Sequence, residues 1–435
     1  MNPCFFYFIC RKGEIKLTNL YDTEKTIEKI ILVGVVDTTD NELSLNELEE
    51  LAITAGCIVA DRLVQKRGGI HRGHYIGKGK IEELKSLIDL TEATGIICDD
   101  ELTSTQLKNM AEMLDTKVMD RTLIILDIFA KHARSAEGKV QVELAQLKYN
   151  LSHLAGLGKS LSRLGAGIGT RGPGEKKLEL DRRNIRNRIS ELSGELQDIE
   201  KHRKILRDNR LKNNTPIVSI VGYTNAGKSS IMNALTNANV LAENKLFATL
   251  DTTTRKYSLP NEGENILLTD TVGFIQKLPT NLIKAFKSTL EELKYADILI
   301  HVVDISNPHH EEHMSVVYST ISDLGCIDKP IITVLNKIDL CDSIENLSDP
   351  YAKNVIQVSA KSGENMETLP LAIDSILKTF KSHISMLIPF EEGKLLNMIY
   401  DSAKILTKEY KDNGVYMEAY VSDEILNRVN KYILQ

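Results

Sequence analysis

Hydrophobic and polar positions in residues 28–134 follow two alternating patterns. Apolar runs of roughly four to eight residues, short enough for buried strands, are separated by longer stretches with helical periodicity. We expect strands at 29–36, 57–64, 95–98 and 117–120, and helices at 44–56, 80–92 and 103–115. This alternation predicts a small parallel sheet covered by helices.

The next segment has a heptad pattern instead. Apolar residues recur at Val140, Leu144, Leu147, Leu151 and Leu154, and then at Leu178, Ile185, Ile189, Leu192, Leu196, Ile199 and Leu206. Two heptad helices joined by a loop predict an antiparallel helical hairpin. The joining segment, 156–174, contains seven glycines, the cations Lys159, Arg163 and Arg171, and no acidic residue.

From Thr215 the alternation of strand and helix patterns resumes. Five apolar runs each end in a polar loop, at 215–222, 265–270, 297–304, 330–336 and 354–360. After Ser382, a helical pattern at 394–410 and a strand pattern at 414–421 predict a small αβ appendage.

Composition and charge narrow the class of protein. A chain of 435 residues with 42% hydrophobic and 26% charged residues is typical of a soluble protein with about three domains. The start of the chain lacks a basic leader and a cleavage site, so we expect a ragged or packed terminus. No apolar run approaches the length of a membrane span. The six cysteines form no C-x-x-C pair, which argues against a disulfide framework and a structural zinc site and fits the cytoplasm.

The net charge of −6 hides an asymmetry. Residues 148–212 contain 16 basic and 8 acidic residues, a surplus of 8 positive charges, which leaves the remainder of the chain at −14 (−6 minus 8). A surplus confined to one segment predicts contact with a polyanion.

The first loop motif fits G-x-x-x-x-G-K-[ST], the P-loop, between a strand and a helix. It consists of Gly222, Tyr223, Thr224, Asn225, Ala226, Gly227, Lys228 and Ser229. Its backbone amides should face phosphates, with Lys228 at the β- and γ-phosphates and the Ser229 hydroxyl on Mg²⁺. The alternative is an ordinary glycine-rich turn, and a chance match has odds of about one or two percent.

Three further loop motifs make a chance match to the P-loop pattern untenable. Their residues are Asp270, Thr271, Val272 and Gly273; Asn336, Lys337, Ile338 and Asp339; and Ser359, Ala360 and Lys361. Asp270 is placed to hold Mg²⁺ through water, and the Gly273 amide to sense the γ-phosphate. Asp339 can accept hydrogen bonds from guanine N1 and N2, and adenine cannot replace them. An unpaired charged acceptor costs about 1.5 to 3 kcal/mol. The four motifs, in this order at strand ends, predict a Mg²⁺-dependent GTPase.

A first switch is expected between Lys228 and Asp270. It contains Phe247, Ala248, Thr249, Leu250 and Asp251. The residues alone do not separate Thr249 from Thr252, Thr253 and Thr254 as the hydroxyl that completes the Mg²⁺ shell. After Gly273 stands Phe274, where Ras-like enzymes use a glutamine to orient the attacking water. Unaided hydrolysis should therefore be slow and need a group from a partner or another loop.

These residues together resemble the HflX family of translational GTPases. The specific marks are YIGKGK (75–80), SRLGAGIGTRGPGE (162–175), LELDRR (178–183), FATLDTTTR (247–255) and DTVGF (270–274). The resemblance implies a GTPase that binds the large ribosomal subunit and splits or rescues stalled ribosomes, with the hairpin reaching ribosomal RNA. It also assigns Thr249 to Mg²⁺, so we expect Lys228, Thr249 and Gly273 to serve catalysis. The family's N-terminal domain has been linked to an ATP-related activity.

The chain departs from the family pattern at two places. Thr252 stands where the family usually has proline, which should loosen the first switch, and Lys176-Lys177 replaces the usual Thr-Gln beside the tip. Neither change removes a ligand.

The fold is thus expected to be α/β, with a P-loop GTPase domain (214–382). An extension (1–27), an α/β domain (28–137) and a basic hairpin (138–213) come before it, and a small αβ domain (383–435) follows.

Some of these motifs also have simpler structural interpretations. The cationic tip, expected to contact RNA, has the alternative of a solvated loop, because charge runs usually face solvent. Gly77-Lys-Gly79 is interpreted as a turn before a helix, with a phosphate contact as the alternative. The run from His309 to His313 is interpreted as a helix start rather than a metal site, since the spacing is not H-E-x-x-H. The rival functions are a GTPase in ribosome assembly or tRNA modification, and a slow nucleotide-gated RNA clamp. Nothing in the sequence demands a dimer.

Overall fold

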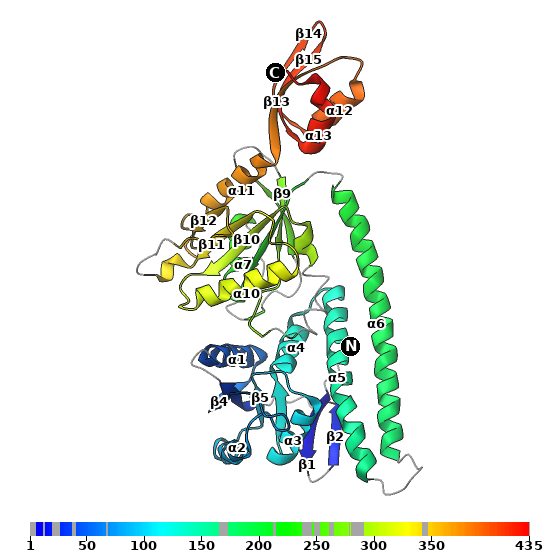
Figure 1. Ribbon diagram of the computed structural model, residues 1–435, viewed down its shortest axis with the longest axis vertical. Helices are drawn as coiled ribbons and strands as arrows, with labels where there is room; N and C mark the ends of the chain where they lie inside the picture. Colours follow the sequence, from blue (N-terminus) through cyan, green and yellow to red (C-terminus); the bar gives the residue numbers. More distant parts are fainter. Residues whose placement is uncertain are drawn as a thin grey trace.

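The structure is a computed structural model. It describes residues 6–11, 14–19, 27–36, 41–66, 68–164, 173–211, 215–236, 246–247, 253–260, 265–277, 279, 291–341 and 347–434. An N-terminal α/β body lies beside a long helical hairpin, a central α/β body follows, and a small αβ unit lies at the far end (Figure 1). No helix among the described residues is long and apolar enough to cross a membrane.

The N-terminal body contains the parallel sheet that the sequence predicts, in the order β4-β3-β5-β6. Its strands are β3 (Lys29–Val36), β4 (Ile58–Lys66), β5 (Gly95–Cys98) and β6 (Lys117–Asp120). Its helices are α1 (Asn41–Ala55), α2 (Lys78–Thr91), α3 (Ser104–Leu114) and α4 (Arg121–His132).

Both faces of this sheet are covered. Alternate residues of β3 point to opposite faces, so Ile30 and Leu32 pack with α1 and α4, whereas Ile31 and Val33 pack with α2 and α3. At the start of the chain, where a ragged or packed terminus is expected, the structure has an antiparallel pair of strands, β1 (Phe6–Arg11) and β2 (Glu14–Asn19).

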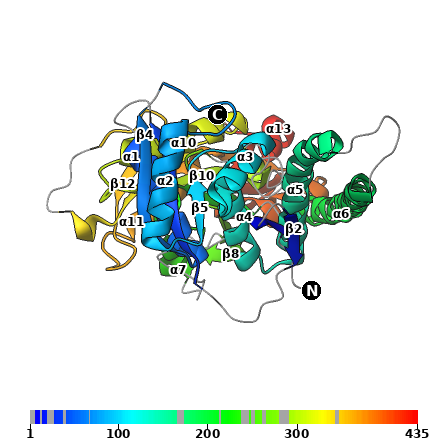
Figure 2. The same cartoon turned by 90° about the horizontal axis from the view of Figure 1, so that it is seen from below.

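The hairpin consists of α5 (Ala136–Leu164) and α6 (Pro173–Leu211), which lie side by side in both views (Figures 1 and 2). Val140 and Leu144 of α5 pack against Leu192 of α6, on the heptad seam. The joining segment is shorter than the predicted 156–174, because α5 continues through Gly156 and Gly158. Leu157, Leu161 and Leu164 extend the apolar spacing, and a glycine inside a helix costs only about 1 kcal/mol.

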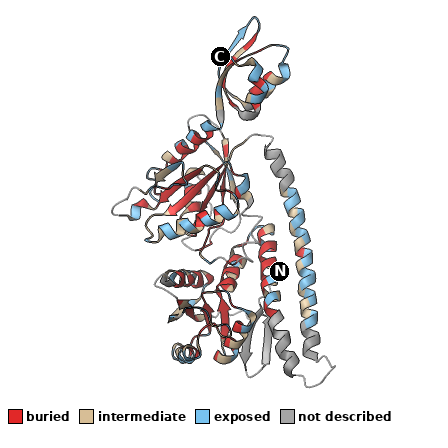
Figure 3. Ribbon diagram, in the orientation of Figure 1, coloured by how far each residue is buried: buried red, intermediate tan, exposed pale blue. Residues whose placement is uncertain are grey.

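The central body has a six-stranded sheet in the order β12-β11-β10-β7-β9-β8, parallel except for β8. The strands are β7 (Ile217–Gly222), β8 (Thr253–Ser258), β9 (Asn265–Asp270), β10 (Ile298–Asp304), β11 (Ile331–Asn336) and β12 (Asn354–Gln357). The helices among the described residues are α7 (Lys228–Thr236), α10 (His310–Asp323) and α11 (Thr368–Thr379), with the short 3-10 turns η1 (Glu291–Tyr295) and η2 (Ile338–Leu340). The inner strands are buried on both faces (Figure 3). This is an α/β arrangement, as the alternation of strand and helix patterns predicts, and its inner strands are covered on both faces.

The terminal unit is an antiparallel sheet in the order β13-β15-β14 with two helices and a final 3-10 turn. Its elements are β13 (Lys381–Ile388), α12 (Gly393–Ser402), β14 (Lys404–Lys411), β15 (Gly414–Ser422), α13 (Asp423–Val429) and η3 (Asn430–Tyr432).

The predicted helix at 394–410 is wrong in its second half. The helix ends at Ser402, and Lys404–Lys411 forms a strand that pairs with β15. The sequence feature that indicates two strands here is Asp412-Asn413-Gly414, which is typical of the tight turn that joins the strands of a hairpin. Gly414 has φ +150°, and a Cβ there would lie 2.3 Å from the Ile388 carbonyl oxygen, so the turn needs glycine.

Candidate nucleotide site

The predicted nucleotide loops meet at one edge of the central sheet. The P-loop follows β7, the Asp270 loop follows β9, the Asn336 loop follows β11, and the Ser359 loop follows β12. These strands are parallel, so their carboxyl ends face the same side, which is where open α/β sheets bind ligands.

Glycine is required at both ends of the P-loop. Gly222 has φ +153°, and a Cβ there would lie 2.3 Å from the Val302 carbonyl oxygen. Gly227 has φ +96°, and a Cβ there would lie 2.2 Å from Asn336 Nδ2. The loop between them curls closely against the neighbouring strand ends, and α7 begins directly afterwards at Lys228. This is the local geometry of a phosphate cradle at a helix N-terminus.

Lys228 is a buried cation. Its Nζ donates a hydrogen bond to the Tyr223 carbonyl oxygen at 2.8 Å. Burial lowers the pKa of Lys228 to about 8, and the charge of Asp270 only partly opposes this. A buried ammonium group that loses this much hydration is stabilised by an anion, so the position suits a phosphate.

Ser229 and Asp270 form an oxygen pair that suits a divalent cation. The Ser229 hydroxyl donates to Asp270 Oδ2 at 2.6 Å, and Asp270 is fully buried. Hydroxyl and carboxylate oxygens are the ligands that Mg²⁺ takes beside phosphates. The described residues contain no group of three His, Cys, Asp or Glu residues able to hold a metal by themselves. The run from His309 to His313 includes the start of α10, as the sequence predicts.

The base-reading loops are tied to the P-loop. Asn336 Nδ2 donates to the Ala226 carbonyl oxygen at 2.9 Å, and the Ala360 amide donates to Asn336 Oδ1 at 3.1 Å. The Ser359 hydroxyl donates to Asp339 Oδ1 at 2.7 Å, which orients the carboxylate. Three loops far apart in sequence are therefore fixed relative to one another by one asparagine and one serine.

Lys337, the second residue of the Asn336 loop, has φ +68°, and its Nζ donates to Asp304 Oδ2 at 2.6 Å. Ile338 is buried, whereas Lys361 is exposed. In the Asp270 loop, the Thr271 hydroxyl donates to the Ile220 carbonyl oxygen at 2.7 Å, and Val272 is buried. The hydrogen-bonded side chains of Lys337 and Thr271 and the buried side chains of Ile338 and Val272 support the loops.

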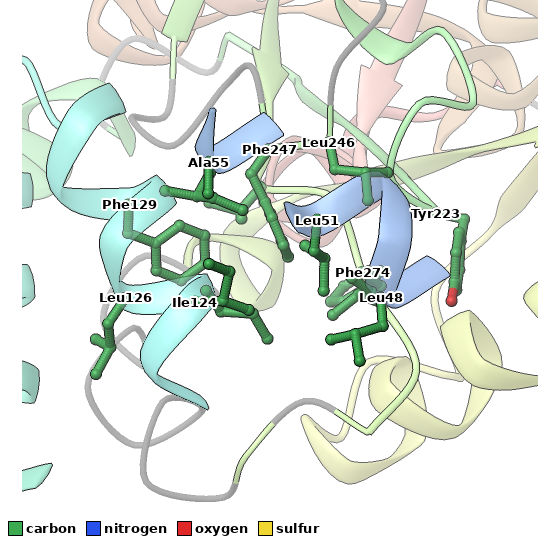
Figure 4. Packing of buried hydrophobic residues seen from close by; sticks show 14 of the residues in the cluster. Leu48, Leu51, Ala55, Ile124, Leu126, Phe129, Tyr223, Leu246, Phe247 and Phe274 are labelled. Atoms are coloured by element: carbon green, nitrogen blue, oxygen red, sulfur yellow. The ribbon is translucent and has the colours of Figure 1, made fainter. Parts of the chain in front are cut away.

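Switch II, defined here as residues 273–277, lies tightly on the P-loop. The Thr224 amide donates to the Phe274 carbonyl oxygen at 2.8 Å, and the Phe274 amide donates to the Gly222 carbonyl oxygen at 3.1 Å. The Phe274 side chain is 2% exposed and belongs to the same apolar cluster as Leu48 and Leu51 of α1 (Figure 4). It is thus an interdomain packing residue in this structure.

Part of the predicted site lies outside the described residues. Ala248, Thr249, Leu250 and Asp251 are among these, as is Arg171 at the hairpin tip. Phe247, at the start of the predicted switch, is buried and packs edge-to-face on Phe129 at 4.7 Å between ring centroids. Lys159 and Arg163 lie in α5, close to its end at Leu164.

Sequence reasoning missed a set of N-terminal residues at this site. Glu47 of α1, Asp99 after β5 and Arg121 at the start of α4 reach the P-loop and switch II. No local spacing pattern links them, because they lie on three separate elements. The available signal was indirect: Arg121 lies between the strand KVMD (117–120) and the apolar run Leu123 to Leu126, and a cation buried there needs partners.

The chain is similar to known GTP-binding proteins over most of its length. Three family models match: "GTP-binding GTPase N-terminal" over residues 42–130, "GTP-binding GTPase Middle Region" over 132–210, and "50S ribosome-binding GTPase" over 217–337. Among similar proteins are the GTPase HflX of Lacrimispora saccharolytica, 53% identical over 94% of this chain and 97% of its own, and that of Escherichia coli K12, 36% identical over 91% and 93%. A solved structure of a GTP-binding protein from Sulfolobus solfataricus in complex with GDP is 27% identical, with a TM-score of 0.43 over 80% of this chain and 98% of the other.

The relatives match almost end to end, and the loops that define a P-loop GTPase are all present in order. The chain therefore belongs to the HflX family of GTPases, and it binds and hydrolyses GTP.

Proposed function

We propose that this GTPase binds the large ribosomal subunit and helps to split or rescue stalled ribosomes. The observation that carries the proposal is the long hairpin joined to a GTP-hydrolysing domain, with the positive surplus of the chain concentrated on it. Cationic contacts to phosphate supply most of the affinity of proteins for RNA. The family model over 217–337 carries the description "50S ribosome-binding GTPase".

In this proposal the hairpin tip contacts ribosomal RNA through Lys159, Arg163 and Arg171. The ends of α5 and α6 that border the tip in sequence lie at a distance from the central body (Figure 1). Nucleotide state at one end and RNA contact at the other would then be coupled through the N-terminal body. The protein would act in the cytoplasm, as a monomer.

The roles at the nucleotide follow from the site. Lys228 stabilises charge on the β- and γ-phosphates, the P-loop amides orient the phosphate chain, and Asp339 selects guanine. Mg²⁺ would be held by Ser229, by Asp270 through water, and by Thr249, and when bound it neutralises charge on the phosphates. The Gly273 amide would contact the γ-phosphate. Because Phe274 cannot activate water, the group that orients the attacking water would come from the ribosome or from another loop.

The test is the steady-state GTP hydrolysis rate of the full chain, alone and with purified large ribosomal subunits. We expect a rise of at least about tenfold, corresponding to about 1.4 kcal/mol of transition-state stabilisation. Lys228→Ala should abolish hydrolysis in both conditions, whereas deletion of 157–172 should remove only the stimulation. A rate that large subunits leave unchanged, with nucleotide binding intact, would contradict the proposal.

Two rival functions would give different results in the same hydrolysis assay. A GTPase of ribosome assembly or tRNA modification would be stimulated by assembly intermediates or tRNA and not by mature subunits. A slow nucleotide-gated clamp would bind RNA in a GTP-dependent manner without multiple turnovers under any condition. Phe274 is buried and cannot itself orient water, which favours this second rival over the first.

A further inference from the structure

Helix α1 of the N-terminal body lies against the nucleotide loops. Leu48 and Leu51 belong to one buried cluster with Tyr223 of the P-loop and Phe274 of switch II (Figure 4). Phe247 of the first switch belongs to the same cluster. The core of the N-terminal body and the two switch regions are thus one continuous packed unit, and a movement of either switch must disturb it.

A polar cluster fixes the same interface. The Tyr223 hydroxyl donates a hydrogen bond to the Glu47 carboxylate and accepts one from the Gln276 backbone amide at 2.8 Å. Arg121, 1% exposed, pairs with the same Glu47 carboxylate and donates to the Gln276 carbonyl oxygen at 3.2 Å. The amide and the carbonyl of Gln276 are therefore both occupied, one by a P-loop side chain and one by the N-terminal body.

The next residue of switch II is held as well. Lys277 Nζ pairs with Asp99, and also with Asp100 at 3.1 Å. Asp99 in turn accepts from Arg121 at 2.8 Å and from the Ser44 hydroxyl at 2.6 Å. Asp99 is 3% exposed, so its charge is paired rather than solvated.

These contacts keep Gly273 close to the P-loop. A Cβ on Gly273 would lie 2.9 Å from Lys228 Nζ and from Thr224 Cα, so not even a methyl group fits there. The Thr224 amide already donates to the Phe274 carbonyl oxygen. Lys228 Nζ and Gly273 thus lie close together, and a γ-phosphate that contacts both would have to be accommodated between them. A shift of switch II away from the P-loop would make that room, whereas the β-phosphate of GDP would not contact Gly273.

We infer that Tyr223 and Glu47 are positioning residues that hold switch II against the P-loop and so favour GDP over GTP. Tyr223 acts through the Gln276 amide, and Glu47 acts by holding the Tyr223 hydroxyl and Arg121. This inference deepens the proposed function, resting on its GTP binding at the P-loop and not on the ribosome.

The chain offers isosteric variants and a matched control. Tyr223→Phe removes only the hydroxyl, and Glu47→Gln keeps the shape of the side chain while weakening its bonds to Tyr223 and Arg121. Glu49→Gln is the control, since Glu49 lies two positions further along α1 but pairs with Arg62, away from the nucleotide loops. Arg121 keeps Asp99 as a partner in every variant, so we expect all of them to fold.

The measurement is the equilibrium affinity of the full chain for GDP and for a non-hydrolysable GTP analogue, with fluorescent nucleotides and without ribosomes. Losing one such hydrogen bond should shift the ratio of the two affinities toward the GTP analogue by about three- to tenfold. The double variant should show about the same shift as the larger single one, because both residues act on the same bond. Basal hydrolysis should rise in the same variants.

Other outcomes would overturn the inference. If Tyr223→Phe weakens binding of both nucleotides equally, the tyrosine supports only the fold of the P-loop. If the affinity ratio in Glu47→Gln equals that in Glu49→Gln, the N-terminal body does not bias the switch. Either result leaves stimulation by large ribosomal subunits untouched, and a failure of that stimulation leaves the affinity ratio untouched.

Discussion

The nucleotide edge of the central sheet and the contact between α1 and switch II are adjacent, yet they are built differently. The nucleotide edge is made of short loops, each formed by three to eight consecutive motif residues. The contact is made of single residues brought together by folding, such as Asp99 and Lys277, which are 178 positions apart. The residues that bind the nucleotide are thus close together in the sequence within each loop. Control over the switch depends instead on tertiary contacts between residues that are far apart in the sequence.

The largest effect should come from breaking the nucleotide edge at its tightest point. Gly227→Ala places a Cβ 2.2 Å from Asn336 Nδ2, on a residue with φ +96°, so the P-loop and the Asn336 loop cannot keep their places together. We expect binding of GDP and GTP to fall below detection by isothermal titration calorimetry. Gly194→Ala is the control, because nothing lies within 4 Å of its Cβ position. Binding that survives in Gly227→Ala would mean that the loop relaxes at little cost.

This difference explains what the sequence could and could not predict. The parallel sheets, the hairpin and the order of the nucleotide loops follow from periodicity and motif spacing, and the fold class is confirmed. Helix ends were harder, since Gly156 is tolerated in α5 where glycines suggested a loop, and Lys404–Lys411 pairs as a strand where an amphipathic pattern suggested a helix. The contacts of Glu47 and Arg121 could not be predicted, because no local pattern states which distant loop a buried charge will meet.

The second effect tests the contact itself. Arg121→Met removes a guanidinium group that is 1% exposed. The carboxylates of Glu47 and Asp99 then lose the cation with which both of them pair. Breaking a buried ion pair from one side costs about 3 to 5 kcal/mol of unfolding free energy. We expect a loss of this size in urea denaturation monitored by circular dichroism.

The exposed pair of Arg188 and Glu143 provides the comparison for this loss. Arg188→Met should cost about 0 to 1 kcal/mol, because solvent screens exposed pairs. Equal losses in the two variants would mean that the buried cluster contributes no more to stability than a surface pair.

A third variant sharpens the comparison by changing specificity and not stability. Asp339→Asn replaces the carboxylate that we propose accepts from guanine N1 and N2, and it keeps a partner for Ser359. Affinity for GDP should fall by about tenfold or more, a loss of about 1.5 to 3 kcal/mol, with the melting temperature nearly unchanged. Asp323→Asn, at the exposed end of α10, is the control. Unaltered GDP affinity in Asp339→Asn would show that this loop does not read the base.

The smallest effect concerns pH and the charge of Lys228. Burial lowers the pKa of Lys228 to about 8 in the nucleotide-free protein, whereas a bound phosphate favours the charged form and raises it. Binding above the lower pKa therefore requires uptake of a proton. Affinity should be nearly full below about pH 7 and should fall by about tenfold between about pH 7 and pH 9.

The control for this dependence is Lys228→Arg, because arginine stays charged throughout this range. Any titration of the guanine base affects both proteins alike, so the difference between their pH profiles isolates the lysine. A profile for the wild-type chain that runs parallel to that of Lys228→Arg would mean that Lys228 remains fully charged without nucleotide. The Asp270 carboxylate would then compensate for burial completely, and the cradle would be electrostatically prepared before any phosphate arrives.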